Sequence, residues 1–179
     1  MARRMSKRAW IILAIVIIAV GVIVGIILSR NSSSPSDITL PIITWNETTL
    51  STLEGIPVVL NFWSIGCSAC RQQLPYLEDV AQQSEGQIKV VAINMADSAA
   101  NIQKFFGDYE PTMILALDDN GKAFVNYCRE YKNPGYIPFT LFIDSEGIVQ
   151  YVKIGAFTGE TQLWNTLNSV LGITVPQTS

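Results

Sequence analysis

Two cysteines separated by two residues, Cys67 and Cys70 in the run Cys-Ser-Ala-Cys, offer the clearest chemistry in this sequence. Cysteines at positions i and i+3 in the first turn of a helix lie close enough to form a disulfide. At the start of a helix, unpaired backbone N–H groups and the helix dipole stabilise a thiolate. Cys67 is therefore the expected nucleophile, and Cys70 is the expected resolving thiol that closes the disulfide.

A structural disulfide and one half of a metal site are the two other interpretations of this pair. The chain has three cysteines and no histidine, so a zinc site, which needs three or four ligands, is hard to complete. A structural disulfide would not require a position between a strand and a helix. The lack of histidine also excludes Ser-His-Asp and Cys-His catalysis within this chain. With so few ligands we expect no metal, and because the sequence has no glycine-rich dinucleotide or phosphate loop we expect no cofactor.

The cysteine pair must be positioned by the elements around it, and the chain alternates apolar runs with helical stretches. Pro57–Trp63 is predicted to be a buried strand that leads into the motif, and residues 70–83 are predicted to be a helix. The other predicted strands are 88–93, 112–117, 139–143 and 148–154, and the other predicted helices are 99–106, 122–127 and 159–171. This order predicts an α/β domain with a central mixed sheet and helices on both faces.

The stretch from Val58 to Pro75 resembles the active-site segment of thioredoxins. It is more closely similar to that of the membrane-anchored TlpA/ResA-like thiol-disulfide oxidoreductases. Residues 137–144 resemble the segment of this family in which a cis-proline, here Pro138, faces the two cysteines. The resemblance covers about residues 38–172.

The resemblance implies a thioredoxin-like fold with a TlpA/ResA-type central insertion, which corresponds here to residues 96–127. Gly155 matches the glycine that follows the last strand of the family. In the family, the backbone at the position of Ile137 pairs with the substrate chain like an added strand. The resemblance implies a substrate-binding surface that consists of Ile137, Pro138, Trp63 and Gly66. It also implies supporting roles for Asn61, Gln73 and Pro75, of which Pro75 matches the proline that kinks the active-site helix.

Several residues depart from the family pattern. Gly66 stands where many relatives carry tryptophan, and Ala69 replaces a common proline. Gln73 occupies a position where these proteins often have glutamate, and Asn61 one where cytoplasmic thioredoxins have a buried aspartate. With neither carboxylate present, a water molecule is the expected base. Cys128 has no counterpart, and a partly buried free thiol is favoured over a third redox thiol.

The N-terminal segment predicts a membrane anchor. Residues 9–28 contain no charged side chain, and 20 residues of helix span roughly 30 Å, the thickness of the hydrocarbon core of a bilayer. A cleavable signal peptide is the other interpretation, but its apolar region usually has about 7 to 15 residues. Four basic residues precede the segment and only Arg30 follows it closely, which predicts a cytoplasmic N-terminus and an extracytoplasmic domain. The predicted parts are a basic N-terminus (1–8), a transmembrane anchor (9–28), a tether (29–37) and a thioredoxin-like domain (38–175).

The charge distribution disfavours nucleic acid as a partner. Residues 1–30 carry five of the twelve basic side chains and none of the fifteen acidic ones, so the remaining residues have a net charge of −8, which repels a phosphate backbone.

The resemblance implies a single-pass protein of the cell membrane that reduces protein disulfides, such as the disulfide formed by the haem-site cysteines of apocytochrome c. A transmembrane thiol carrier would be its electron donor. An oxidase or isomerase of exported proteins and a redox-inert peptide-binding module remain open alternatives. A peroxidase of the peroxiredoxin type is disfavoured because Ser64 stands where such enzymes have threonine.

Overall fold

The computed structural model describes Val16, Leu53 and residues 55–174. The chain divides into two units, residues 1–33 and 34–179, and the account below concerns the second unit. The predicted anchor (9–28) and tether (29–37) lie outside the described residues, apart from Val16. Within the described part of the chain, no helix combines the length and the apolar character needed to cross a membrane.

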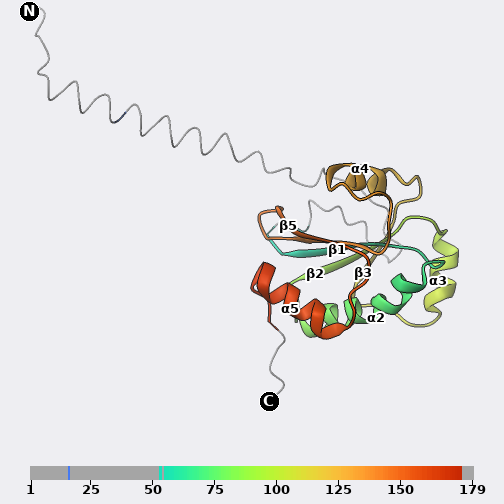
Figure 1. Cartoon of the computed structure of the whole chain (residues 1–179). Helices are drawn as coiled ribbons and strands as arrows, with labels where there is room; N and C mark the ends of the chain where they lie inside the picture. The colour runs from blue at the N-terminus through green and yellow to red at the C-terminus, as the bar shows by residue number, and fades with distance from the viewer. Residues whose placement is uncertain (1–15, 17–52, 54, 175–179) are drawn as a thin grey trace, which may run out of the picture. The chain divides into compact units, whose positions relative to one another are not determined.

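A five-stranded mixed sheet with the strand order β3-β2-β1-β4-β5 forms the centre of the second unit (Figure 1). The strands are β1 (Val58–Trp63), β2 (Lys89–Asn94), β3 (Ile114–Leu117), β4 (Phe139–Ile143) and β5 (Val149–Ile154). Strand β2 runs parallel to both β1 and β3, whereas β4 is antiparallel to β1 and β5. The predicted central mixed sheet is confirmed, and the antiparallel pair of β4 and β5 forms one of its edges.

Helices cover both faces of the sheet, so that every residue of β1 is buried. The helices are α2 (Ser68–Gln83), α3 (Ala99–Phe106), α4 (Lys122–Glu130) and α5 (Glu160–Leu171). In Figure 1, α2 and α5 lie on one face and α4 lies on the other. Val59 and Trp63 belong to the core on the α2 side, whereas Leu60 and Phe62 belong to the core on the α4 side. Alternating side chains of one strand therefore supply two cores.

Each predicted element within the described residues is present, with ends that differ by a few residues. Helix α2 begins at Ser68 rather than at Cys70 because Cys67 is its N-cap residue. Helix α4 continues to Glu130, beyond its predicted end, so that Cys128 is part of the helix. The limits of a helix depend on capping contacts that periodicity alone does not show.

The predicted central insertion, residues 96–127, forms α3, β3 and most of α4. Buried Asp118 holds the start of α4 in place, since its carboxylate accepts hydrogen bonds from the N–H groups of Ala123 (3.2 Å) and Phe124 (2.8 Å). Such bonds satisfy donors that a helix leaves unpaired in its first turn.

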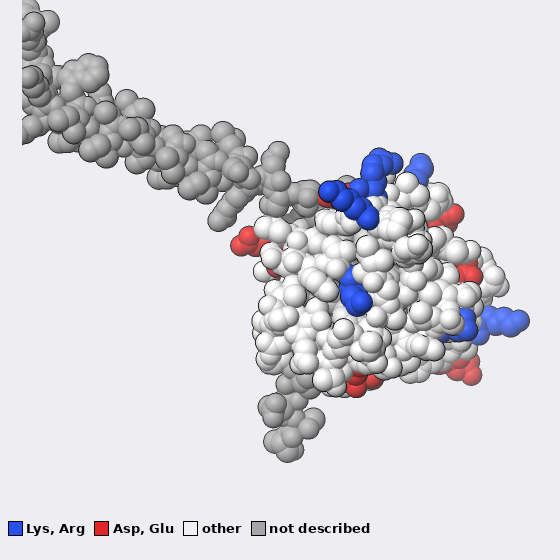
Figure 2. All heavy atoms as spheres, in the orientation of Figure 1, with Lys and Arg blue, Asp and Glu red and all other residues white. Residues whose placement is uncertain are grey.

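Charged side chains are few and widely spaced on the face of the molecule seen in Figure 2, where Lys and Arg gather mainly near α4. No broad basic surface covers this face. A protein that binds a phosphate backbone usually presents such a surface.

Candidate active site

Cys67 and Cys70 form a disulfide at the N-terminus of α2, with their Cα atoms 5.2 Å apart. The N–H of Cys70 donates a hydrogen bond to Cys67 Sγ at 3.1 Å. This contact places Cys67 Sγ at the positive end of the helix dipole, where a thiolate is stabilised. Cys67 is half-buried, whereas Cys70 is only 1% exposed. The geometry suits an accessible nucleophile followed by a buried resolving thiol.

The Ile137–Pro138 peptide bond is cis, as the family resemblance implied. The Ile137 carbonyl oxygen lies 3.8 Å from Cys67 Sγ, so this segment borders the disulfide. Ile137 is half-buried and Pro138 is buried. The N–H of Gly155 donates to the Pro138 carbonyl at 2.9 Å, and Gly155 adopts a φ of 89°, a conformation that favours glycine.

The loop before Cys67 is held by side chains that the sequence motif did not single out. The N–H of Ile65 donates to Asp97 Oδ2 at 2.8 Å, and Arg71 Nη1 donates to the Ile65 carbonyl. Asn94 Nδ2 donates to the same Asp97 oxygen at 2.9 Å. A signal was available, because an asparagine at the end of a strand with an aspartate three residues later favours a turn closed by their side chains.

Behind the cysteines lies a buried hydrogen-bond network of neutral groups. Asn61 Nδ2 and Gln73 Nε2 both donate to Thr140 Oγ1, at 2.9 Å and 3.2 Å. Gln73 Oε1 accepts from the N–H of Phe157 at 3.0 Å. None of these three side chains is more than 1% exposed. The network joins α2 to β1, β4 and the segment before α5 without a charged side chain.

Trp63 does not belong to the substrate-binding surface where the resemblance placed it. Its side chain is 0% exposed, and its ring packs against those of Phe105 and Phe106, so the prediction that it contacts substrate is wrong.

Gly66, by contrast, is exposed, and a Cβ atom added there would meet nothing within 4 Å, so the surface next to the disulfide is open. Pro75 lies inside α2 and is exposed.

Tyr136 borders the site although no motif pointed to it. It is 65% exposed, more than any other large hydrophobic side chain of the described residues. Buried Asn133 holds its backbone, because Asn133 Oδ1 accepts from the Tyr136 N–H at 2.8 Å and Asn133 Nδ2 donates to the Tyr136 carbonyl at 2.9 Å. An aromatic side chain displayed on a fixed loop, directly before Ile137, is typical of a recognition surface.

Cys128 is a half-buried free thiol, as predicted. It packs against the core on the α4 side of the sheet, whereas Cys70 belongs to the core on the α2 side. Burial raises the pKa of the Cys128 thiol, and a backbone hydrogen bond with Gly135 acts in the opposite direction. A raised pKa leaves less of the reactive thiolate at neutral pH.

The mixed sheet between two helical layers, the disulfide at a helix N-terminus and the adjoining cis-proline define a thioredoxin-like redox protein. The chain belongs to the AhpC/TSA family, whose model matches residues 34–152. Within it, the chain is similar to ResA-like thiol-disulfide oxidoreductases, as the resemblance of residues 58–75 implied.

Three known proteins illustrate this similarity. Thiol-disulfide oxidoreductase ResA of Oceanobacillus iheyensis is 31% identical over 110 residues, which are 61% of this chain but only 55% of that protein. ResA of Geobacillus kaustophilus is 27% identical over 129 residues, 72% of this chain and 71% of that protein. A crystal structure from Chlorobium tepidum, described as a thiol:disulfide interchange protein DsbE, is 25% identical and superposes with a TM-score of 0.63. It covers 76% of this chain and 96% of its own.

Proposed function

We propose that this protein is a thiol-disulfide oxidoreductase that reduces the disulfides of other proteins. The observation that carries the proposal is the disulfide between half-buried Cys67 and buried Cys70 at the start of α2, beside the Ile137 carbonyl. The names of the two ResA relatives support the same chemistry. A redox-inert binding module would be favoured by a permanently buried Cys67, and Cys67 is only half-buried.

The reaction proceeds by two thiol-disulfide exchanges. The Cys67 thiolate attacks one sulfur of a substrate disulfide, so that a mixed disulfide forms and the other substrate sulfur leaves as a thiolate, which takes up a proton. Cys70, as a thiolate, then attacks Cys67 Sγ and releases the second substrate thiolate. Two electrons pass to the substrate, and the protein is left with the disulfide that the structure contains. A dithiol protein must return two electrons before the next cycle.

The finer part of the proposal rests on the sequence. An uncharged segment at 9–28 after a basic N-terminus supports a membrane anchor and a domain on the outer side. There, the resemblance favours exported substrates such as the haem-site disulfide of an apocytochrome c, and a transmembrane thiol carrier as the electron donor. The substrate chain would pair with the backbone of Ile137 as an added strand.

Single cysteine variants of the full-length chain in detergent test the chemistry. We expect Cys70→Ser to accumulate a mixed disulfide with a peptide substrate, because no resolving thiol remains, and Cys67→Ser to form none. Cys128→Ser is the matched control and should react as the parent protein does. Full exchange activity in both Cys67→Ser and Cys70→Ser would rule out the proposal.

The equilibrium reduction potential of the Cys67–Cys70 pair tests the direction of electron flow. We expect a reducing potential of about −270 mV when the full-length chain is equilibrated with dithiothreitol redox buffers. A reduction potential of about −120 mV would instead identify an oxidase of exported proteins.

A further inference from the structure

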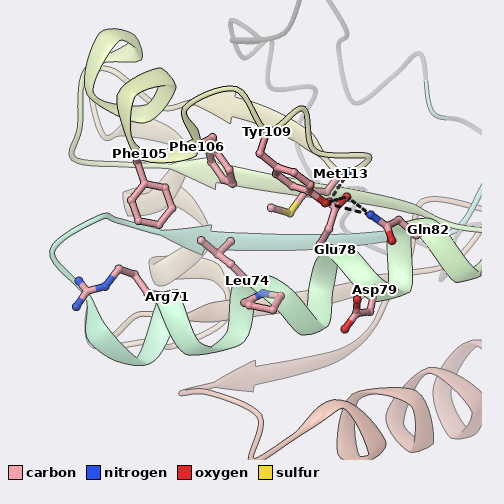
Figure 3. A pocket seen from close by; sticks show the side chains of 10 residues that line it. Arg71, Leu74, Glu78, Asp79, Gln82, Phe105, Phe106, Tyr109 and Met113 are labelled. Atoms are coloured by element: carbon pink, nitrogen blue, oxygen red, sulfur yellow. Dashed lines mark hydrogen bonds between the residues drawn. The ribbon is translucent and has the colours of Figure 1, made fainter.

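A groove of about 370 Å³ runs along α2, on the side that faces α3 and the loop after it (Figure 3). We call it the α2–α3 groove. Its apolar lining includes Leu74, Phe105, Phe106 and Met113, and Arg71 and Gln82 are near its two ends. Neither cysteine of the disulfide lines it, and neither does the Ile137–Pro138 segment. The groove is thus separate from the surface where an added strand would pair.

Glu78 builds one wall of the groove, and its carboxylate is held by hydrogen bonds within the protein. The residue is 6% exposed, and its carboxylate accepts hydrogen bonds from the N–H groups of Thr112 (2.7 Å) and Met113 (3.1 Å), and from the side chains of Tyr109 (2.9 Å) and Gln82 (2.9 Å). Burial acts to raise the pKa of Glu78, but these four hydrogen bonds outweigh it, and the pKa lies below its usual value. The ionised carboxylate therefore ties the loop to α2, and the groove is built into the fold.

The α2–α3 groove begins where the redox site ends. Residues three or four apart share one face of a helix, so Arg71, Leu74, Glu78 and Gln82 follow one another along the same stripe of α2, and Cys67 is the N-cap residue one turn before Arg71. The N–H of Arg71 donates to the Cys67 carbonyl at 3.1 Å, and the Arg71 guanidinium donates to the carbonyl of Ile65, two residues before Cys67. A polypeptide bonded to Cys67 Sγ that extends along this stripe meets Arg71 first and the apolar lining next.

The groove presents groups that suit such a polypeptide. Phe105 is 39% exposed and Tyr109 is 50% exposed, so aromatic surface faces water there. Within the described part of the chain, the Arg71 guanidinium donates to the Ile65 carbonyl and forms no ion pair. Its positive charge is therefore available to a carboxylate. Exposed aromatic side chains beside an available charge are characteristic of protein interaction sites.

We propose that the α2–α3 groove binds a segment of the polypeptide that forms the mixed disulfide with Cys67. An aromatic or branched aliphatic side chain of this segment packs on Phe105 and Leu74, and an acidic side chain pairs with Arg71. The inference rests on the proposed function and adds a substrate class to it. The protein prefers disulfides that are followed by acidic and apolar residues over those in a purely polar context.

Two peptide disulfides of equal length test this preference. One carries glutamate and phenylalanine after the reactive cysteine, and the other carries serine at both positions. The full-length chain in detergent is compared with its Phe105→Ser and Tyr151→Ser variants. Tyr151 is the control, since it is 40% exposed, lies on β5 outside the groove and, among the described residues, packs its ring on that of Phe142 alone. Exchange with bis(2-hydroxyethyl) disulfide, which is too small to reach the groove, reports the basal activity.

We expect the parent protein to favour the Glu-Phe peptide about tenfold in kcat/KM, which corresponds to about 1.4 kcal/mol. Phe105→Ser should lose most of this preference through a higher KM, while Tyr151→Ser keeps it. Equal kcat/KM for the two peptides in the parent protein would overturn the inference. So would an equal loss for both peptides in Phe105→Ser.

A measurement without chemistry separates this inference from the proposed function. The Glu-Phe peptide with its cysteines replaced by serine is added to the isotope-labelled chain, and backbone amide resonances are followed. We expect shifts at Leu74, Phe105 and Phe106, and shifts confined to other residues, or none, would overturn the groove assignment. Failure of every disulfide to react, with these shifts intact, would count against the redox function alone.

Discussion

Gln73 is a buried amide with both of its ends hydrogen-bonded, to Thr140 and to the N–H of Phe157. In Gln73→Glu the bond to Thr140 loses its donor, and burial should raise the pKa of the new carboxyl group. Because the folded-state pKa of this carboxyl would lie above its unfolded value of about 4.3, the variant is stable while the carboxyl is protonated, below the unfolded pKa. It loses this stability as the pH rises through the folded-state pKa. We therefore expect Gln73→Glu to be destabilised by about 1–3 kcal/mol at neutral pH and by much less near pH 4.

Urea unfolding at the two pH values measures this effect. Gln72→Glu is the matched control, because Gln72 lies next to Gln73 on α2 but is exposed, so its carboxylate should cost little at either pH. Equal stability of Gln73→Glu at both pH values would show that the site accommodates a charged carboxylate.

Tyr136 carries a prediction about substrate recognition. Its exposed ring stands next to the backbone with which an added strand would pair, and aromatic side chains often supply much of the binding energy at interfaces. We expect Tyr136→Ala to raise the KM for a peptide disulfide by about three- to tenfold, with kcat little changed. Val125→Ala, an exposed apolar position on α4, should leave KM unchanged. Steady-state kinetics check both variants, and an unchanged KM in Tyr136→Ala would exclude the ring from binding.

At the scale of elements, Glu78 connects α2 to the loop that precedes β3. A glutamine there offers a single oxygen to four donors and turns a donor group toward them, so we expect Glu78→Gln to lose about 1–3 kcal/mol at neutral pH. Because the folded pKa lies below the usual value, this stabilisation is present above the unfolded pKa and is lost as the pH falls through the folded one. The two proteins should therefore converge in stability as the solution is made acidic.

Asp79 is the natural comparison for this prediction because its pKa is shifted the other way. Burial, and then the charges of Glu160 and Glu78, raise the pKa of Asp79. Its ionised form gains nothing from folding, so Asp79→Asn should not destabilise the protein at neutral pH. Urea unfolding of both variants at several acidic pH values measures how the free energy of unfolding of each depends on pH, and so tests the opposite directions of the two pKa shifts. A loss in Asp79→Asn as large as that in Glu78→Gln would contradict this account.

The elements were predictable from the sequence because their signals are local. From the apolar run of β1 and the cysteine pair that follows it, the start of α2 was predicted to within two residues of its observed position. The contacts across the sheet were not predictable in this way, since Asn61 and Thr140 are 79 residues apart and meet only when β1 pairs with β4. Trp63 was assigned wrongly for the same reason. Its position after a buried strand is visible in the sequence, but the rings of α3 that cover it are not.

At the scale of the whole molecule, the proposed membrane anchor would determine where the chemistry takes place. If residues 9–28 span the bilayer with the four preceding basic residues inside, Cys67 is outside the cell. The full-length chain expressed in bacteria should then sediment with membranes and remain there in alkaline carbonate. A chain that lacks residues 9–28 should be released. Recovery of the full-length chain in the soluble fraction would show that the segment is cleaved or does not span.

Orientation is tested by labelling intact cells with a maleimide that does not cross membranes, after mild reduction of the disulfide. We expect the parent protein to be labelled and Cys67→Ser to be labelled much less, because Cys70 is 1% exposed and Cys128 is half-buried with a raised pKa. Labelling that requires permeabilised cells would place the domain inside.

An outward domain has a thermodynamic consequence, since each substrate disulfide that it reduces consumes two electrons on the oxidising side of the membrane. Sustained activity there requires a thiol donor that carries electrons across the bilayer, so spheroplasts without such a donor should reduce one equivalent of substrate and stop.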